Sequence, residues 1–102
     1  MDYELAKLLE QTGWPQAGKG AWVVNPRVLV GRDRVYAPTL EELIAGCGEW
    51  LCELRQLQAS QGWLASATAD MSASGHTPAE AVARLWLAIQ QRRVGEASGD
   101  RV

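Results

Sequence analysis

The 102-residue sequence lacks phenylalanine and is poor in histidine and cysteine, with one and two residues respectively. The cysteines, Cys47 and Cys52, form no C-x-x-C pair and have no second pair beside them, so a tetrahedral zinc site lacks ligands. No apolar run approaches the ~18 residues typical of a transmembrane helix. We therefore expect no metal or other cofactor, no membrane span, and free thiols in a reducing cytoplasm, with a disulfide as the less favoured alternative.

An excess of either charge is also missing, since 10 basic residues stand against 12 acidic ones, for a formal net charge of −2. A protein that binds nucleic acid normally concentrates a basic excess on one face, because contacts with phosphates supply most of the non-specific affinity. The charge balance therefore argues against a nucleic-acid partner. Asp2 and Glu4 occupy the region where a secretory signal carries lysine or arginine, so we expect a cytoplasmic protein.

Tryptophan and the aliphatic residues dominate what is present. Five tryptophans occur among the 47% of residues that are hydrophobic, and each tryptophan can bury about 200 Å². A chain of this length fits one domain, and these side chains suffice for its core. We predict a single domain over residues 1–93 and a flexible tail over residues 94–102.

Helix and strand signals alternate along the first half of the chain. Asp2 can cap a helix over residues 2–12, and Gly13 is well placed to end it. Three short strand-like segments follow, the last two flanking a predicted hairpin turn at residues 31–34. These segments are residues 21–24, 28–30 and 35–36.

The next helix begins with a capping box over residues 39–42. In this motif the Thr39 hydroxyl accepts a hydrogen bond from the Glu42 amide, and the Glu42 carboxylate accepts one from the Thr39 amide. We predict a helix over residues 40–47, ended by Gly48.

The segment after this helix has two interpretations. The apolar pattern can continue into one long helix through Leu57, but Gly46 and Gly48 would each cost about 1 kcal/mol inside it. We therefore favour a β-hairpin with strands over residues 52–58 and 63–68. The long helix is the alternative.

A second T-x-x-E sequence, at residues 77–80, predicts the start of the last helix, which we expect to end near Gln91. The small and polar residues 71–76 before it are predicted to form a loop. Strand-like sequence followed by T-x-x-E and a helix thus occurs twice, either as two ββα units around one sheet or as two ordinary helix starts. The predicted fold class is α+β, a single small domain with an antiparallel sheet of short strands against two or three helices.

Few residues suggest catalytic chemistry. His76 is the single histidine, and to act in catalysis it would need a partner such as Cys52, Glu53 or Asp70 beside it in space. Cys47 falls on the apolar face of its helix, which is typical of a small buried hydrophobic residue. We therefore predict that the protein is not an enzyme, with no catalytic, cofactor-binding or metal-binding residue and no small-molecule substrate.

The sequence Gly18-Lys19-Gly20 has a partial likeness to a phosphate-binding loop. It lacks the G-x-x-x-x-G-K-[ST] spacing, and a strand rather than a helix is predicted after it. No nucleotide-binding site is therefore predicted.

The last helix suggests an association surface. Leu85, Trp86 and Leu87 follow one another and cannot all face one small sheet. Part of this trio should therefore meet a second surface, either the first helix or another protein chain. We predict a protein partner or a homodimer. The candidate interface residues are Trp86, Leu87, Trp63 and Arg92.

Three segments resemble a group of small uncharacterised proteins of tailed phages and prophages. They are residues 1–9, residues 37–48 and residues 77–89, which read MDYELAKLL, APTLEELIAGCG and TPAEAVARLWLAI. The group shares the patterns APTLxELIxxCG and TPxEAVAxLWLAL, and the resemblance covers nearly the whole chain except the first β region and residues 51–58. It implies no specific activity, but it suggests a non-enzymatic accessory protein that binds a protein and modulates a process of the bacterial host, including host defence.

The last third of the chain is also similar to part of the HicB-like antitoxins. Residues 63–68, Gly75 and residues 77–81 match the strand, loop and GxTxEEA helix start of that group. HicB-like antitoxins neutralise a small toxin, so this likeness implies a toxin–antitoxin role as the alternative function.

Overall fold

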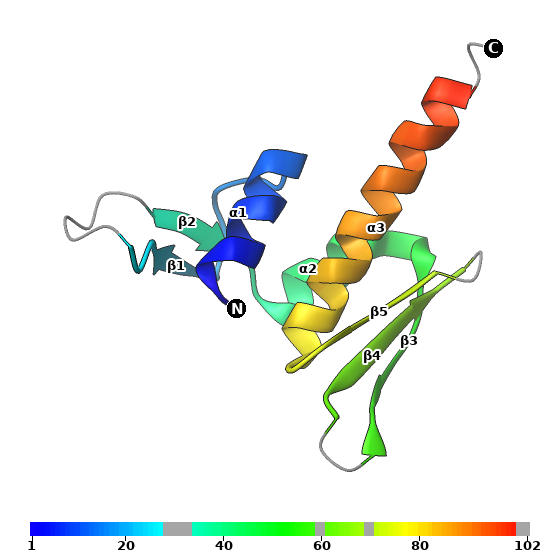
Figure 1. Cartoon of the computed structure of the whole chain (residues 1–102), viewed down its shortest axis with the longest axis horizontal. Helices are drawn as coiled ribbons and strands as arrows, with labels where there is room; N and C mark the ends of the chain where they lie inside the picture. The colour runs from blue at the N-terminus through cyan, green and yellow to red at the C-terminus, as the bar shows by residue number, and fades with distance from the viewer. Residues whose placement is uncertain (28–33, 59–60, 69–70, 100–102) are drawn as a thin grey trace.

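The chain combines three α-helices with a two-stranded and a three-stranded antiparallel sheet in the part that the structure describes (Figure 1). The structure is a computed structural model, and it describes residues 1–27, 34–58, 61–68 and 71–99. The predicted α+β class is confirmed. The strands are divided between two sheets, however, and do not share the single sheet that two side-by-side ββα units would form.

Helix α1 (Tyr3–Thr12) has the predicted ends. The Leu5 amide donates to Asp2 Oδ1 over 2.9 Å, and Gly13 adopts a left-handed conformation with φ 111° after the last turn. The helix buries an apolar stripe that contains Leu5 and Leu9. Trp14, the second residue after the helix, is buried in the core.

Strands β1 (Ala21–Val24) and β2 (Arg34–Ala37) form the two-stranded sheet, with Trp22 opposite Tyr36. Helix α1 packs on this sheet, where a small buried cluster unites Ala6 with Val35 and Ala37. The predicted strand over residues 28–30 and the first three residues of the predicted turn lie outside the described residues.

Helix α2 (Leu40–Cys47) ends at Gly48 as predicted, and its capping box is complete. A short 3₁₀ helix, η1 (Gly48–Trp50), leads directly into strand β3 (Leu51–Gln56). The long-helix alternative is therefore wrong, since Gly48 has a positive φ of 58° and breaks the helical path. Strand β3 pairs with β4 (Trp63–Ala67), which confirms the favoured hairpin.

Strand β5 (Ser72–Gly75) corrects the prediction of a loop over residues 71–76. It pairs with the other edge of β4, so the order of the three-stranded sheet is β3-β4-β5. Small polar residues have a weak strand signal, but the backbone of β4 supplies hydrogen-bond partners that sequence patterns do not reveal. Gly75 is also needed here, because a Cβ atom would lie 2.6 Å from Glu80 Cβ.

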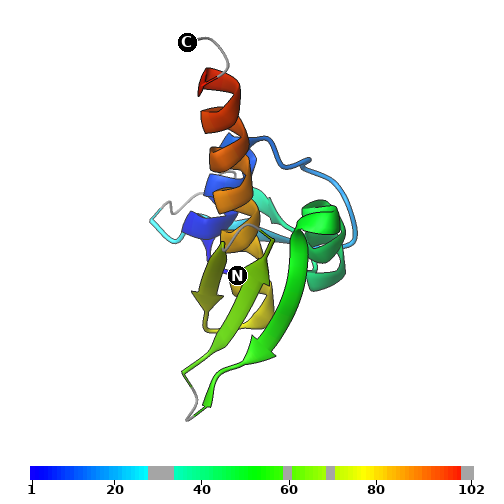
Figure 2. The same ribbon diagram turned by 90° about the vertical axis from the view of Figure 1, so that its right-hand side faces the viewer.

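Helix α3 (Pro78–Gly99) starts as predicted but continues eight residues past the predicted end at Gln91. Residues 94–99, predicted as part of a flexible tail, are therefore helical, and only residues 100–102 lie outside the description. One glycine at position 95 costs about 1 kcal/mol in a helix, which is too little to end it. Helix α3 crosses one face of the three-stranded sheet (Figure 2).

The main core forms where α3 meets α1, α2 and the three-stranded sheet. Leu85 is fully buried and Trp86 is 8% exposed, while Leu87 is partly buried against the same core. The second surface that this trio requires is thus supplied within the chain. No helix in the described part of the chain combines the length and the apolar character that crossing a bilayer requires.

Candidate functional site

An open apolar groove of about 450 Å³ lies between α2 and the segment that follows α1. The groove has aromatic, aliphatic and glycine walls with one carboxylate at its side. Its lining residues are Trp14, Pro15, Ala17, Glu42, Ala45, Gly46 and Trp86. Small-molecule sites are usually apolar concavities with a few placed polar groups, so this groove is the candidate functional site.

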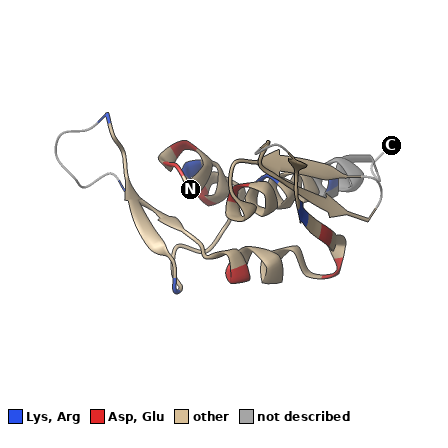
Figure 3. Ribbon diagram, turned by 90° about the horizontal axis from the view of Figure 1, so that it is seen from below, with Lys and Arg blue, Asp and Glu red and all other residues tan. Residues whose placement is uncertain are grey.

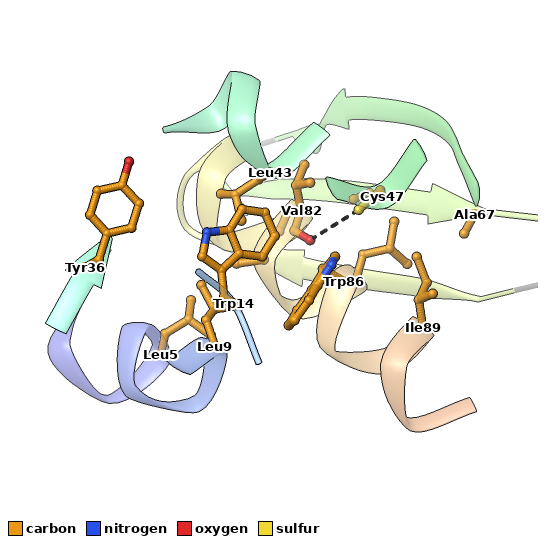
Figure 4. Close-up of a cluster of buried hydrophobic side chains, with 14 residues drawn as sticks. Leu5, Leu9, Trp14, Tyr36, Leu43, Cys47, Ala67, Val82, Trp86 and Ile89 are labelled. Atoms are coloured by element: carbon orange, nitrogen blue, oxygen red, sulfur yellow. Dashed lines mark hydrogen bonds between the residues drawn. The ribbon is translucent and has the colours of Figure 1, made fainter. Parts of the chain in front are cut away.

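Two tryptophans from distant parts of the chain build the aromatic wall. The rings of Trp14 and Trp86 meet edge to face, with centroids 4.9 Å apart and planes 77° apart (Figure 4). The Trp14 amide donates to the Leu9 carbonyl over 2.9 Å, which holds this residue against the end of α1. Gly46 completes the contact, since a Cβ atom there would lie 2.6 Å from the Trp14 ring.

Glu42 is the polar side chain of the groove. Its Oε1 accepts a hydrogen bond from the Tyr36 hydroxyl over 2.6 Å and another from the Thr39 amide over 2.9 Å. The backbone amide of Lys19 donates to the same carboxylate. The carboxylate is therefore fixed in position by a buried phenol, its own helix start and a loop from another part of the chain.

These hydrogen bonds set the protonation of both partners. The bond from Tyr36, together with those from Thr39 and Lys19, holds the pKa of Glu42 below its ordinary value of 4.5. Burial raises the pKa of Tyr36 above 10.0, and the bond to Glu42 raises it further. At neutral pH the side of the groove thus carries an ionised carboxylate beside a neutral phenol.

The loop over residues 16–20 is shaped to follow Tyr36 and Glu42. Gln16 Oε1 accepts from the Tyr36 amide over 2.9 Å, and the Gly20 amide donates to Tyr36 Oη. A Cβ atom on Gly18 would lie 2.0 Å from Glu42 Oε2. The glycines around Lys19 therefore permit close packing of the loop, which is a structural reason for a sequence that partly resembles a phosphate loop.

The structure distributes the four predicted interface residues over different places. Trp86 lines the groove, although little of its surface is exposed. Trp63 and Leu87 are partly buried against the main core, and Arg92 is exposed on α3. Of the four, Trp86 is the residue that belongs to the groove lining.

Besides Trp86, the groove contains Trp14 and Glu42, and the sequence did not identify either of them as a site residue. Trp14 directly follows the glycine that ends α1, so a signal for its position existed, but nothing in the pattern linked it with Trp86. Glu42 was assigned to capping alone. Its further bond to Tyr36 depends on the tertiary packing of β2 against the start of α2.

The residues considered for catalysis do not meet in the groove. His76 and Cys52 are exposed, and neither belongs to the described lining, while Asp70 lies outside the described residues. Cys47 is buried, as predicted, and burial raises the pKa of its thiol to about 11. Both cysteines are free thiols.

Within residues 1–27, 34–58, 61–68 and 71–99, no three histidine, cysteine, aspartate or glutamate side chains gather in a way that could hold a metal ion. Comparisons of the chain with protein-family models, with curated proteins and with solved structures returned no match.

Proposed function

We propose that the chain is a non-enzymatic accessory protein of phage or prophage origin that binds another protein through the groove lined by Trp14 and Trp86. The groove is the observation that carries this proposal. Its lining is largely apolar, and its two tryptophans, each 8% exposed, belong to a residue type that is enriched among residues that dominate binding energy at protein interfaces. The origin rests on the resemblance of the capping and helical segments to phage proteins.

The surface beside the groove also suits a protein partner. Ile44, on the same helix as Ala45 and Gly46, leaves 38% of its surface exposed. Exposed apolar side chains next to a concave site extend the area that a partner can cover. We propose that the partner belongs to a host process in the cytoplasm, as the resemblance suggests.

Ala45 allows a direct test, because it lines the groove from an exposed position on α2. Ala45→Glu places a charge in the groove without touching the core, so the tagged variant should lose the partner that the wild-type protein captures from its native host. Gln91→Glu, at an exposed position of α3, is the matched control and should retain that partner. Circular dichroism should show both variants folded, and an Ala45→Glu variant that captures the same protein equally well would contradict the proposal.

The identity of the captured protein separates the proposed function from its alternative. A host enzyme or regulator supports the accessory role. A small toxin encoded beside this chain would instead indicate a HicB-like antitoxin.

A further inference from the structure

We propose that the groove receives a positively charged side chain, an arginine guanidinium or a lysine ammonium, carried by an exposed segment of the partner protein. This inference rests on the proposed function and specifies the chemistry of its partner. It is carried by the position of the Glu42 carboxylate beside two tryptophans in one concave site.

The first argument concerns charge. The groups that bond to the Glu42 carboxylate are the Tyr36 hydroxyl, the Lys19 amide, and the amide and hydroxyl of Thr39, all neutral. They orient the carboxylate without cancelling its formal charge. A cation that enters the groove is attracted by this charge even without a direct hydrogen bond to the carboxylate.

The second argument concerns the aromatic walls. A cation near the face of an indole is attracted by the ring electrons, and tryptophan is the most effective of the aromatic side chains. The same chain already shows this contact elsewhere, since the Arg34 guanidinium lies 5.2 Å from the ring centre of Trp22. The two groove indoles each leave 8% of their surface exposed, and this exposed part lines the same groove as the Glu42 carboxylate.

The third argument concerns the surroundings. Residues 40–50, which include α2, contain three glutamates and no lysine or arginine, while Glu53 beyond them pairs with Arg55 and Lys19 lies in the loop that contacts Glu42. In Figure 3 acidic positions accordingly mark α2, whereas the described part of the β1–β2 hairpin carries basic positions. The potential on the α2 side of the groove therefore favours the approach of a basic segment.

Two small probes test the inference on the intact protein. N-acetylarginine N-methylamide carries the guanidinium, and the matching citrulline derivative has nearly the same shape without the charge. Titration of each probe, followed by NMR of the indole N–H groups, should give saturable shifts at Trp14 and Trp86. The citrulline probe should bind at least about five-fold more weakly.

Glu42→Gln provides the decisive variant, because glutamine can retain the capping bond while removing the charge. It should reduce the preference for the arginine probe to less than about two-fold. Glu41→Gln is the matched control, since Glu41 is exposed on the same helix and is not among the lining residues. Equal binding of both probes to the wild-type protein, no binding of either, or an equal effect of the two variants would overturn the inference.

Failure of the cation inference can be distinguished from failure of the proposed function. If the arginine probe fails while Ala45→Glu still releases the captured protein, the groove binds a partner without using a cation. Sedimentation of the wild-type protein should show a monomer. Self-association that Arg34→Gln abolishes would assign the groove to a second copy of this chain and overturn the choice of another protein.

Discussion

The two T-x-x-E helix starts of this chain begin from the same local chemistry and end in different surroundings. In both, the threonine hydroxyl accepts a hydrogen bond of 3.2 Å from the glutamate amide three residues later, at Thr39 and Glu42 and at Thr77 and Glu80. Glu42 completes its capping box and also bonds to Tyr36. Glu80 instead accepts from the His76 amide over 3.1 Å at an exposed position.

The difference lies in what packs above each helix start. Strand β2 and the loop over residues 16–20 cover the first one, and they add the Tyr36 hydroxyl and the Lys19 amide to its hydrogen bonds. The second follows directly from edge strand β5 and lacks such a cover in the described structure. Both capping motifs of this chain thus start a helix, but only the one whose carboxylate is covered by other segments contributes that carboxylate to the groove.

A substitution in the loop over residues 16–20, which covers the first helix start, should have the largest effect on the free energy of unfolding. Gly18→Ala places a methyl group against Glu42 and Tyr36 and also strains a backbone with φ 150°, so we expect a loss of about 2–3 kcal/mol in the free energy of unfolding. Urea denaturation followed by tryptophan fluorescence measures this loss. Gly13→Ala is the control, because its φ of 111° carries strain without overlap, and it should cost about 1 kcal/mol. Equal losses would show that the loop does not press on Glu42.

Removal of the Tyr36 hydroxyl should have the next largest effect. Tyr36→Phe leaves the Gly20 amide without its acceptor and takes a donor from Glu42, so we expect a loss of about 1–3 kcal/mol. The same urea titration measures it. A loss below about 0.5 kcal/mol would mean that water replaces both bonds, and the first helix start would then resemble the second.

The two capping threonines offer the direct comparison. Thr39→Ala should cost about 1–2 kcal/mol and Thr77→Ala about 0.5–1 kcal/mol, since the first cap is part of a larger set of hydrogen bonds. Thermal and urea denaturation of both variants check the order. A greater loss for Thr77→Ala would contradict the greater importance of the first cap.

The smallest expected difference between the two helix starts is in how the free energy of unfolding depends on acidic pH. The folded-state pKa of Glu42 lies below 4.5, so its bonds stabilise the fold above that pH, and the contribution is lost as the pH falls through the folded-state value. Glu42→Gln should therefore flatten the dependence of unfolding free energy on pH below about 5. Glu80→Gln removes a carboxylate from the same motif position and is the matched control. The wild-type slope should persist in that variant.

The predictions from sequence succeeded where a local signal marks an element. Asp2, the two capping threonines and Gly48 mark helix ends through hydrogen bonds or conformations that involve a few neighbouring residues. The prediction failed at β5, whose serines and glycine pair with β4. It also ended α3 too early. The interface prediction named Trp86 but not its partners in the groove.

Local chemistry was therefore sufficient for the helix starts, the turn from α2 into β3 and the α+β class, because capping bonds and hydrophobic periods act over a few residues. Packing of distant segments was required for the separation of the two sheets, the Trp14–Trp86 contact and the Tyr36–Glu42 bond. Residues 72 positions apart in the chain form the aromatic wall, and such contacts leave no period or motif in a single sequence. The carboxylate of Glu42 is recognisable as a cap from its neighbours and as part of a groove only from the folded chain.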